Sequence, residues 1–159
     1  MDVLTSVIKD INHKDAEKER KKKYLKRYKK NRACVNRLYD KLEFVTSKLD
    51  RISAPSLSNM PRGGITKSKS DLSNEKIDLE RRIAKLEKTG AKLKEETYDL
   101  IDQILDPNLV EVMELLFIQC YEMDDVKELL ALSSRQLNRK YAKALDSITL
   151  DKEVQGWYM

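Results

Sequence analysis

Residues 24–52 read YLKRYKKNRACVNRLYDKLEFVTSKLDRI, and seam-forming side chains recur in them at alternating steps of four and three. The positions at this spacing are Tyr24, Tyr28, Asn31, Val35, Leu38, Leu42, Val45, Leu49 and Ile52. A heptad repeat of this kind places these side chains in one line along a helix, the seam that faces a partner helix, and is typical of a coiled coil. We therefore predict a long helix over about 15–53, whose seam becomes firmly apolar only from Val35 onward. Asn31 lies on the seam, where a buried Asn fixes the register of packed helices at a cost in stability.

A second run with the same stepping predicts another long helix over about 72–105. Its seam positions are Leu72, Lys76, Leu79, Ile83, Leu86, Gly90, Leu93, Thr97, Leu100 and Ile104. Ser70 or Asp71 is suited to cap its start. Gly90 lowers helix stability by up to about 1 kcal/mol relative to Ala, and its missing side chain suits a close helix approach or a local bend.

Two seams of matched length predict an antiparallel helical hairpin, that is, a two-stranded coiled coil. A two-helix hairpin buries little surface by itself. We therefore expect it to form a homodimer or a higher homo-oligomer through apolar positions off the seam, among them Ile77, Ile101 and Leu105.

Residues 54–71, APSLSNMPRGGITKSKSD, interrupt both patterns. They hold two of the three prolines and two of the four glycines of the chain, together with many serines. This composition predicts a flexible loop between the helices. Arg62, Lys67 and Lys69 make the loop basic, which suits contact with nucleic acid or a partner, and a simple connector fits equally well.

The remaining part, 106–159, reads as a separate domain. Asp106 followed by Pro107 is a strong start signal, because Asp caps a helix and Pro fits its first position. The helix after it carries the most apolar face of the chain, formed by Leu109, Val112, Met113, Leu116, Phe117 and Cys120. A short helix, MDDVKELLAL, follows, and a tight connection through Leu132 leads to the last helix.

The last helix begins in the stretch SSRQLNRKYAKAL, residues 133–145, with Ser133 as its cap. Its apolar face consists of Leu137, Tyr141, Ala144, Leu145 and Ile148. The other side carries Ser134, Arg135, Gln136, Asn138, Arg139 and Lys143. Arg, Gln and Asn make paired hydrogen bonds to base edges in the major groove, and Ser or backbone amides at a helix start bind phosphate. An ordinary amphipathic helix with a solvated basic face fits the same pattern.

Charge is distributed unevenly along the chain. The formal net charge is +5, yet residues 18–32, KERKKKYLKRYKKNR, hold ten Lys or Arg against one Glu. Such a block suits phosphate backbones or an acidic partner. The side chains that we expect to contact phosphate are Lys21, Lys22, Lys23, Lys26, Arg27, Lys29 and Lys30. Segment 107–159 holds six basic and nine acidic residues, so its attraction for DNA has to come from its last helix and from this block.

The amino-acid composition limits which class of protein this chain can belong to. Charged residues make up 37% of the chain and Gly and Pro are scarce, which predicts an all-α fold with a thin core. Cys34 and Cys120 match no metal-ligand spacing and fit a reducing cytoplasm. No apolar run approaches the roughly 20 residues of a membrane span. His13 is the single histidine, and without a nucleophile motif or phosphate loop we expect neither an enzyme nor a cofactor or metal.

Helix, short helix, tight turn and basic helix is the plan of a helix-turn-helix DNA reader. We therefore predict binding of double-stranded DNA, with the last helix reading bases and the block 18–32 contacting phosphates. The four segments of the predicted organisation are 1–53, a basic N-terminal segment and first long helix; 54–71, the loop; 72–105, the second long helix; and 106–159, the helix-turn-helix domain.

The chain resembles phage late-transcription regulators of the ArpU and RinA type, whose C-terminal domain is similar to region 4 of bacterial sigma factors. The resemblance covers about 20–148 and is carried by the stretch MPRGG from Met60 to Gly64, by Asp106-Pro107 and by Leu115 to Leu145. It implies a DNA-binding activator of phage or prophage late genes in the cytoplasm of a bacterial host, acting with host RNA polymerase.

The resemblance also places roles on residues. By position, Ser133, Ser134, Arg135, Gln136, Asn138, Arg139 and Lys143 match the recognition helix of the family. Two positions depart from the family pattern. Lys127 stands where a small residue is usual, so this Lys has to extend outward or open the helix crossing. Ala131 stands where Gly is usual in the turn, and Ala adopts a left-handed conformation only with strain.

Other interpretations remain open. Small terminase subunits, which package phage DNA, also join a helix-turn-helix to a coiled-coil assembly. A structural or inhibitory coiled-coil module would use the basic helix on an acidic protein partner. In a basic-zipper arrangement, the block 18–32 would precede the seam at 35–52.

Overall fold

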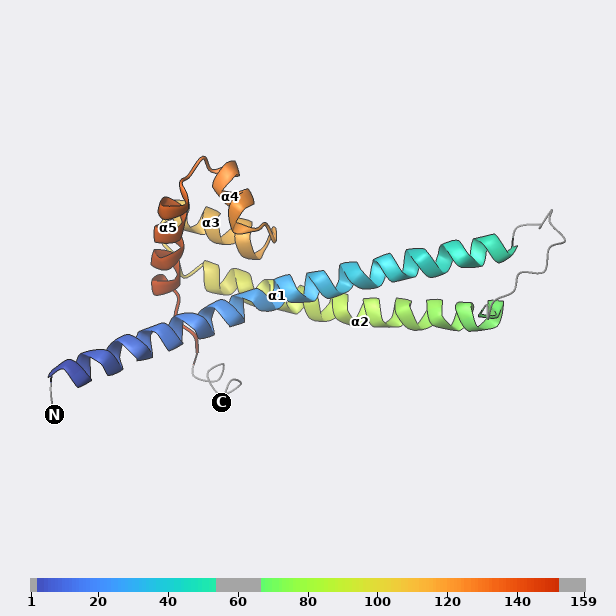
Figure 1. Cartoon of the computed structure of the whole chain (residues 1–159), viewed down its shortest axis with the longest axis horizontal. Coiled ribbons are helices and arrows are strands. Elements are labelled where there is room, and N and C mark those ends of the chain that lie inside the picture. Colours follow the sequence, from blue (N-terminus) through green and yellow to red (C-terminus); the bar gives the residue numbers. More distant parts are fainter. Residues whose placement is uncertain (1–2, 54–66, 152–159) are drawn as a thin grey trace. The chain divides into compact units, whose positions relative to one another are not determined.

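The computed structural model describes residues 3–53 and 67–151. In these ranges the secondary structure is helical and contains no strand, which confirms the all-α prediction (Figure 1). The helices are α1 (Val3–Ser53), α2 (Lys69–Ile101), α3 (Pro107–Phe117), α4 (Met123–Leu129) and α5 (Ser134–Ser147). None of the described helices has the length and apolarity that crossing a bilayer requires.

The chain divides into two compact units whose boundaries fall inside the long helices. One unit comprises Asn31–Gly90, and the other comprises Met1–Lys30 together with Ala91–Met159. The segments expected from the sequence instead divide at the helix ends. Packing therefore groups the first half of α1 with the C-terminal helices.

In the unit Asn31–Gly90, the two helical segments lie side by side along a single seam (Figure 1). The buried cluster consists of Leu38, Val45, Leu72, Leu79 and Ile83, with Leu42, Leu49 and Leu86 partly buried around it. These are positions that the heptad stepping selects, because a seam side chain is the one that reaches the neighbouring helix. Ile52 is 48% exposed, so the seam prediction is wrong at this position.

Asn31 and Gly90 form a close helix contact in this unit. The Asn31 side-chain amide donates to the Leu86 carbonyl oxygen at 3.0 Å. A Cβ on Gly90 would collide with the amide oxygen of Asn31. The glycine therefore serves a close approach between helices.

The ends of the long helices differ from the expected ones. α1 begins at Val3, about twelve residues earlier than predicted. α2 begins at Lys69, and its cap is Ser68, whose hydroxyl accepts from the Asp71 amide at 3.1 Å; the predicted caps Ser70 and Asp71 lie inside the helix. The rest of the predicted loop, 54–66 with the MPRGG stretch and Arg62, lies outside the described residues, as does 152–159.

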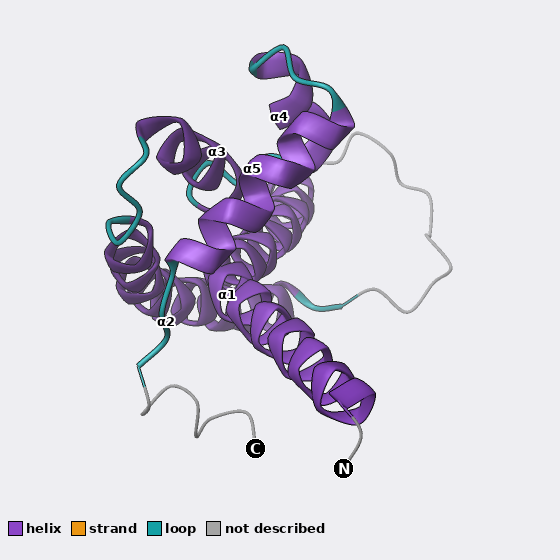
Figure 2. Cartoon of the chain, turned by 90° about the vertical axis from the view of Figure 1, so that its left-hand side faces the viewer, coloured by secondary structure: helices purple, strands orange, loops and turns teal. Residues whose placement is uncertain are grey.

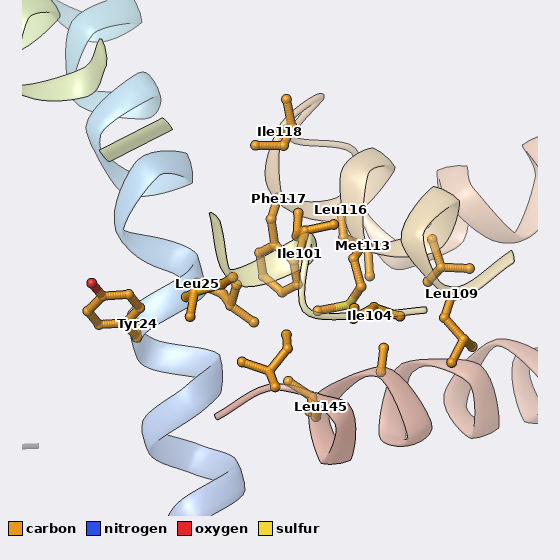
Figure 3. Close-up of a cluster of buried hydrophobic side chains, with 14 of the residues drawn as sticks. Tyr24, Leu25, Ile101, Ile104, Leu109, Met113, Leu116, Phe117, Ile118 and Leu145 are labelled. Atoms are coloured by element: carbon orange, nitrogen blue, oxygen red, sulfur yellow. The ribbon is translucent and has the colours of Figure 1, made fainter. Parts of the chain in front are cut away.

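The other unit contains the larger core. α3, α4 and α5 pack against one another, and the start of α3 has the expected cap, with Asp106 accepting from the Asn108 amide at 2.9 Å. Side chains from all five helices and their flanks form the core: Tyr24, Leu25, Leu100, Ile101, Ile104, Leu109, Val112, Met113, Leu116, Phe117, Ile118, Val126, Leu137, Ala144, Leu145, Ile148 and Leu150. Figure 3 shows Leu25 of α1 beside Ile101 of α2, with Leu145 of α5 pointing toward the same cluster.

Ile101 corrects one expectation about self-association. Its side chain is fully buried in this core and is not available to a second copy. Leu105 is 94% exposed and Ile77 is 45% exposed, so both remain accessible. The α2 helix ends at Ile101, four residues before the predicted end at about 105.

Candidate nucleic-acid interface

The first turn of α5 is held by a capping box. The Ser133 hydroxyl accepts from the Gln136 backbone amide at 3.2 Å, and the Gln136 side-chain oxygen accepts from the Ser133 amide at 2.9 Å. These two bonds satisfy donors that every helix start leaves without an intrahelical partner. The helix therefore begins at a fixed residue, and the side chains after it have a defined register.

One face of α5 anchors the helix in the core. Leu137, Ala144 and Leu145 are buried, and Ile148 directly after the helix is 1% exposed. Tyr141 lies half-buried on the same side, with its ring 6.1 Å from the Phe117 ring. Burial raises the pKa of the Tyr141 phenol to about 12, with a smaller contribution from the Glu19 carboxylate.

The opposite face of α5 is open to solvent. The seven predicted DNA-binding residues are all exposed: Ser133, Ser134, Arg135, Gln136, Asn138, Arg139 and Lys143. Among the residues that the structure describes, no carboxylate pairs with Arg135, Arg139 or Lys143. Asp146, the acid nearest to them in sequence, lies 3.7 Å from the Lys18 ammonium instead. This face therefore has cations and an amide available for a ligand.

Gln136 differs from the other six residues in what it can offer a base. Paired recognition of adenine by Gln uses the side-chain oxygen and the side-chain NH2 together. The capping box already engages that oxygen. Gln136 is therefore a capping residue, and paired base recognition by Gln136 would require the box to open.

The turn between α4 and α5 accommodates both Lys127 and Ala131. Ala131 has a φ of 51°, the left-handed conformation that Gly adopts without strain. Its amide donates to Glu128 O at 3.2 Å and the Leu132 amide donates to Lys127 O at 3.0 Å, which is the Schellman pattern at a helix end. Lys127 extends outward, where its ammonium lies 3.5 Å from Asp124. Figure 2 shows the N-terminal end of α5 beside α4 and its C-terminal end near α1.

The basic block of α1 divides into an inner and an outer set of side chains. Lys21 belongs to the inner set: it is 7% exposed and its ammonium donates to the Leu145 carbonyl oxygen at 3.0 Å. A cation at this place is favourable because the C-terminal end of α5 carries partial negative charge. Lys21 is thus not placed to contact phosphate, which corrects the prediction for this residue.

Two more of the predicted phosphate contacts hold partners within the same unit. The Arg27 guanidinium lies 2.6 Å from the Glu96 carboxylate and stacks 3.6 Å from the Tyr24 ring centroid. The Lys29 ammonium lies 2.7 Å from Glu122. Both cations attach α1 to neighbouring segments, so a phosphate would have to displace a carboxylate to reach them.

The outer set consists of Lys23, Lys26 and Lys30, which are exposed and recur at steps of three and four along one face. Among the described residues they form no hydrogen bond or ion pair, although Lys23 and Lys26 help to lower the pKa of the Glu19 carboxylate by electrostatic attraction. Lys22 is intermediate: its ammonium lies 2.9 Å from Glu19, whose pKa this lysine lowers, and 5.9 Å from the Tyr141 ring centroid.

A cavity of about 300 Å³ joins the two candidate regions. Lys22, Lys26 and Lys29 of α1 and Asn138 and Tyr141 of α5 line it, together with Leu116, Phe117, Tyr121, Glu122 and Met123. The base-reading candidate Asn138 and three cations of the basic block therefore border the same space.

Sequence reasoning missed about the first twelve residues of α1. Val3, Leu4, Val7, Ile8 and Ile11 follow helical spacing, and this signal was available in the sequence. The polar segment after Ile11, with His13 and its neighbours, concealed the continuity with the heptad region. In the structure α1 runs through it without a break.

Comparisons with known proteins add no assignment, since no family model, no curated protein and no solved structure matches this chain.

Proposed function

We propose that this chain is a sequence-specific DNA-binding transcriptional regulator in which α4, its turn and α5 form a helix-turn-helix. The single observation that carries the proposal is the exposed face of α5, where Arg135, Asn138 and Arg139 extend from a capped and anchored helix. Arg suits guanine and Asn suits adenine in the major groove. Because the capping box and the buried face fix the helix, these side chains are pre-organised to enter a groove.

Phosphate contacts in this proposal come from two places. The Ser133 and Ser134 hydroxyls, together with the Ser134 and Arg135 backbone amides that the capping box does not use, suit one phosphate. Lys23, Lys26 and Lys30 of α1 supply exposed cations that form no hydrogen bond or ion pair among the described residues. The long hairpin of α1 and α2, which we propose to be a coiled coil, serves assembly of a homodimer or higher homo-oligomer.

The resemblance to regulators of the ArpU and RinA type gives the proposal its biological setting. On this basis the chain activates late genes of a phage or prophage in the bacterial cytoplasm and meets host RNA polymerase near a promoter. The turn conformation of Ala131 and the outward course of Lys127 support the resemblance, because both departures leave the α4–α5 turn intact.

Binding of the purified full chain to fragments of its own genome, followed across a salt series, tests the proposal. We expect a footprint limited to one or a few sequences, together with an affinity that falls as salt rises. Uniform binding to every fragment, abolished by moderate salt, would contradict sequence-specific regulation and assign all binding to the lysine block.

Paired variants assign the roles. Arg139→Ala should weaken binding to the specific site by about 5- to 150-fold, the effect of losing one paired contact worth about 1–3 kcal/mol. Arg81→Ala removes an exposed arginine of α2 and is the matched control, which should leave affinity unchanged. Replacing Lys23, Lys26 and Lys30 together by Gln should lower the slope of log affinity against log salt by roughly three.

Two results would favour the other interpretations. Partner binding that is retained after Arg135 and Arg139 are both changed to Ala would favour a structural or inhibitory coiled-coil module that binds protein. A ring-shaped assembly bound to a packaging sequence, seen by native mass spectrometry, would favour a small-terminase-like packaging component.

A further inference from the structure

The N-terminal part of α1 carries an aliphatic stripe that nothing described covers. Val3, Leu4, Val7, Ile8 and Ile11 form it, and their side chains are 79%, 74%, 47%, 55% and 53% exposed. Spacings of three and four place these five side chains along one side of the helix. We call this surface the N-terminal stripe.

The segment that carries the N-terminal stripe buries none of its side chains against the described part of the unit. All residues from Val3 to Ala16 are exposed. A helix of about this length is marginal in water by itself, because helical stability in proteins comes mainly from packing of an apolar face. A partner along the stripe would supply that packing.

The charges beside the stripe indicate what kind of partner fits. Lys9, Asp10, Lys14 and Asp15 alternate in sign around it, whereas the block 18–32 that follows holds ten basic residues against one acidic residue. Nucleic acids and anionic lipid surfaces are negatively charged, so they bind helices that carry cations beside the contact face. The nearly neutral flanks of the stripe give no such preference, so its partner is an apolar helical face without a large charge.

The stripe itself has this chemistry. We propose that a second copy of this chain covers the N-terminal stripe, so that residues 3–11 of two copies pack helix against helix in a homodimer. A two-fold contact requires a patch that complements itself. Five Val, Leu and Ile side chains meet this requirement, because pairing them with their own copies buries no charge.

The size of the stripe sets the strength of the contact. Nine residues of helix span about 13 Å, and one helix face of that length is smaller than the roughly 800 Å² per partner of a standard stable interface. We therefore expect a dimer that forms progressively as concentration rises. This contact differs from the hairpin surface around Ile77, and it does not depend on DNA.

Sedimentation equilibrium of the full chain over a wide concentration range tests the proposal. Ile8→Lys should raise the dimer dissociation constant at least about tenfold, since each copy loses a buried aliphatic side chain and gains a charge in the contact. Ile77→Lys tests the hairpin surface separately. The matched control is Ile52→Lys, which changes the same residue type at similar exposure, 48%, near the C-terminal end of α1. It should leave the dissociation constant unchanged. All three positions are exposed, and circular dichroism at high dilution checks that the three variants stay folded.

Several results would overturn the proposal. These are a chain that stays monomeric at the highest concentration, association that Ile8→Lys does not weaken, or association that Ile77→Lys weakens instead. Pelleting of the wild-type chain with anionic vesicles, lost in Ile8→Lys without any change in sedimentation, would assign the stripe to a lipid surface. Arg139→Ala separates this inference from the proposed function, because it should reduce specific DNA affinity while leaving self-association intact.

Discussion

Lys21 shows how one side chain can change role between sequence and structure. It lies within a run of lysines that reads as a phosphate-binding block, yet its ammonium is buried against the last carbonyls of α5. Leu25 and Tyr28 follow it at steps of four and seven and are also buried. The lysine therefore belongs to the inner face of α1, and it joins α1 to α5.

Replacing Lys21 should destabilise the protein. Lys21→Met keeps the length of the side chain but removes the charged donor to Leu145 O, and we expect the free energy of unfolding to fall by about 1–3 kcal/mol. Urea denaturation measures the loss. Lys23→Met, two residues further on at an exposed position, is the control and should stay within about 0.5 kcal/mol of wild type. Equal effects of the two substitutions would show that burial of Lys21 contributes nothing.

The left-handed turn residue Ala131 should be improved by glycine. In the folded state this conformation costs Ala about 1–2 kcal/mol of strain, which Gly avoids. The greater freedom of glycine in the unfolded chain offsets about 0.4–1 kcal/mol of that gain. Ala131→Gly should thus raise the free energy of unfolding by about 0.5–1 kcal/mol. Ala142→Gly, inside α5, should lower it by about 1 kcal/mol. Thermal unfolding of the pair gives the comparison, and a loss at both positions would contradict the assigned φ.

Tyr141 gives stability a dependence on alkaline pH. Its folded pKa is raised to about 12, chiefly by burial, whereas an unfolded tyrosine titrates near 10. The unfolded state therefore releases the phenol proton first, and stability falls as pH rises from about 10 toward 12. Urea midpoints at pH 9 and pH 11 should fall more for the wild type than for Tyr141→Phe. Parallel curves for the two proteins would argue against this origin.

At the scale of the element, α1 has three consecutive environments. Residues 3–16 are exposed, the stretch around Leu25 packs into the larger core, and the stretch after Asn31 packs along the seam with α2. One continuous helix thereby serves two packing units.

The Asn31–Gly90 contact should reverse the usual effect of a helix substitution. Gly→Ala in a helix interior ordinarily stabilises by about 1 kcal/mol. Gly90→Ala should instead destabilise by at least about 1 kcal/mol, because the new Cβ would collide with the Asn31 amide oxygen. In an Asn31→Ala background the substitution should become stabilising. A double-mutant cycle by urea denaturation measures the coupling, and additive effects would refute the contact.

At the scale of the whole molecule, stability should differ between regions of the chain. The larger core contains seventeen buried side chains and the seam cluster contains five. Residues 3–16 bury none in the single chain. Local opening costs least where few apolar contacts hold a segment. The three regions should therefore exchange their amide hydrogens at different rates.

Hydrogen exchange followed by mass spectrometry at high dilution checks this order. Amides of 3–16 should exchange fastest, those of the hairpin more slowly, and those around Leu25 and Met113 slowest of all. At high concentration, protection of 3–16 should rise if the N-terminal stripe pairs. Slow exchange of 3–16 at every concentration would show that another contact within the chain covers it.

The sequence by itself determined the features that depend on neighbours along the chain. Heptad stepping selected most buried seam positions, and the caps Asp106 and Ser133 were identified because a helix start is a local hydrogen-bonding problem. The solvent-facing side of α5 followed from its apolar spacing. These predictions hold because periodicity and capping act over a few residues.

Only the tertiary structure decided which cations are accessible. Lys21 lies three residues before Tyr24 and so continues the seam spacing, but that spacing does not show that α5 covers Lys21 or that Lys23 stays exposed. The sequence could not place Ile101 in the core either. Burial and hydrogen bonding at these residues depend on segments far apart in the chain, and their mutual packing is set by the free energy of the whole fold.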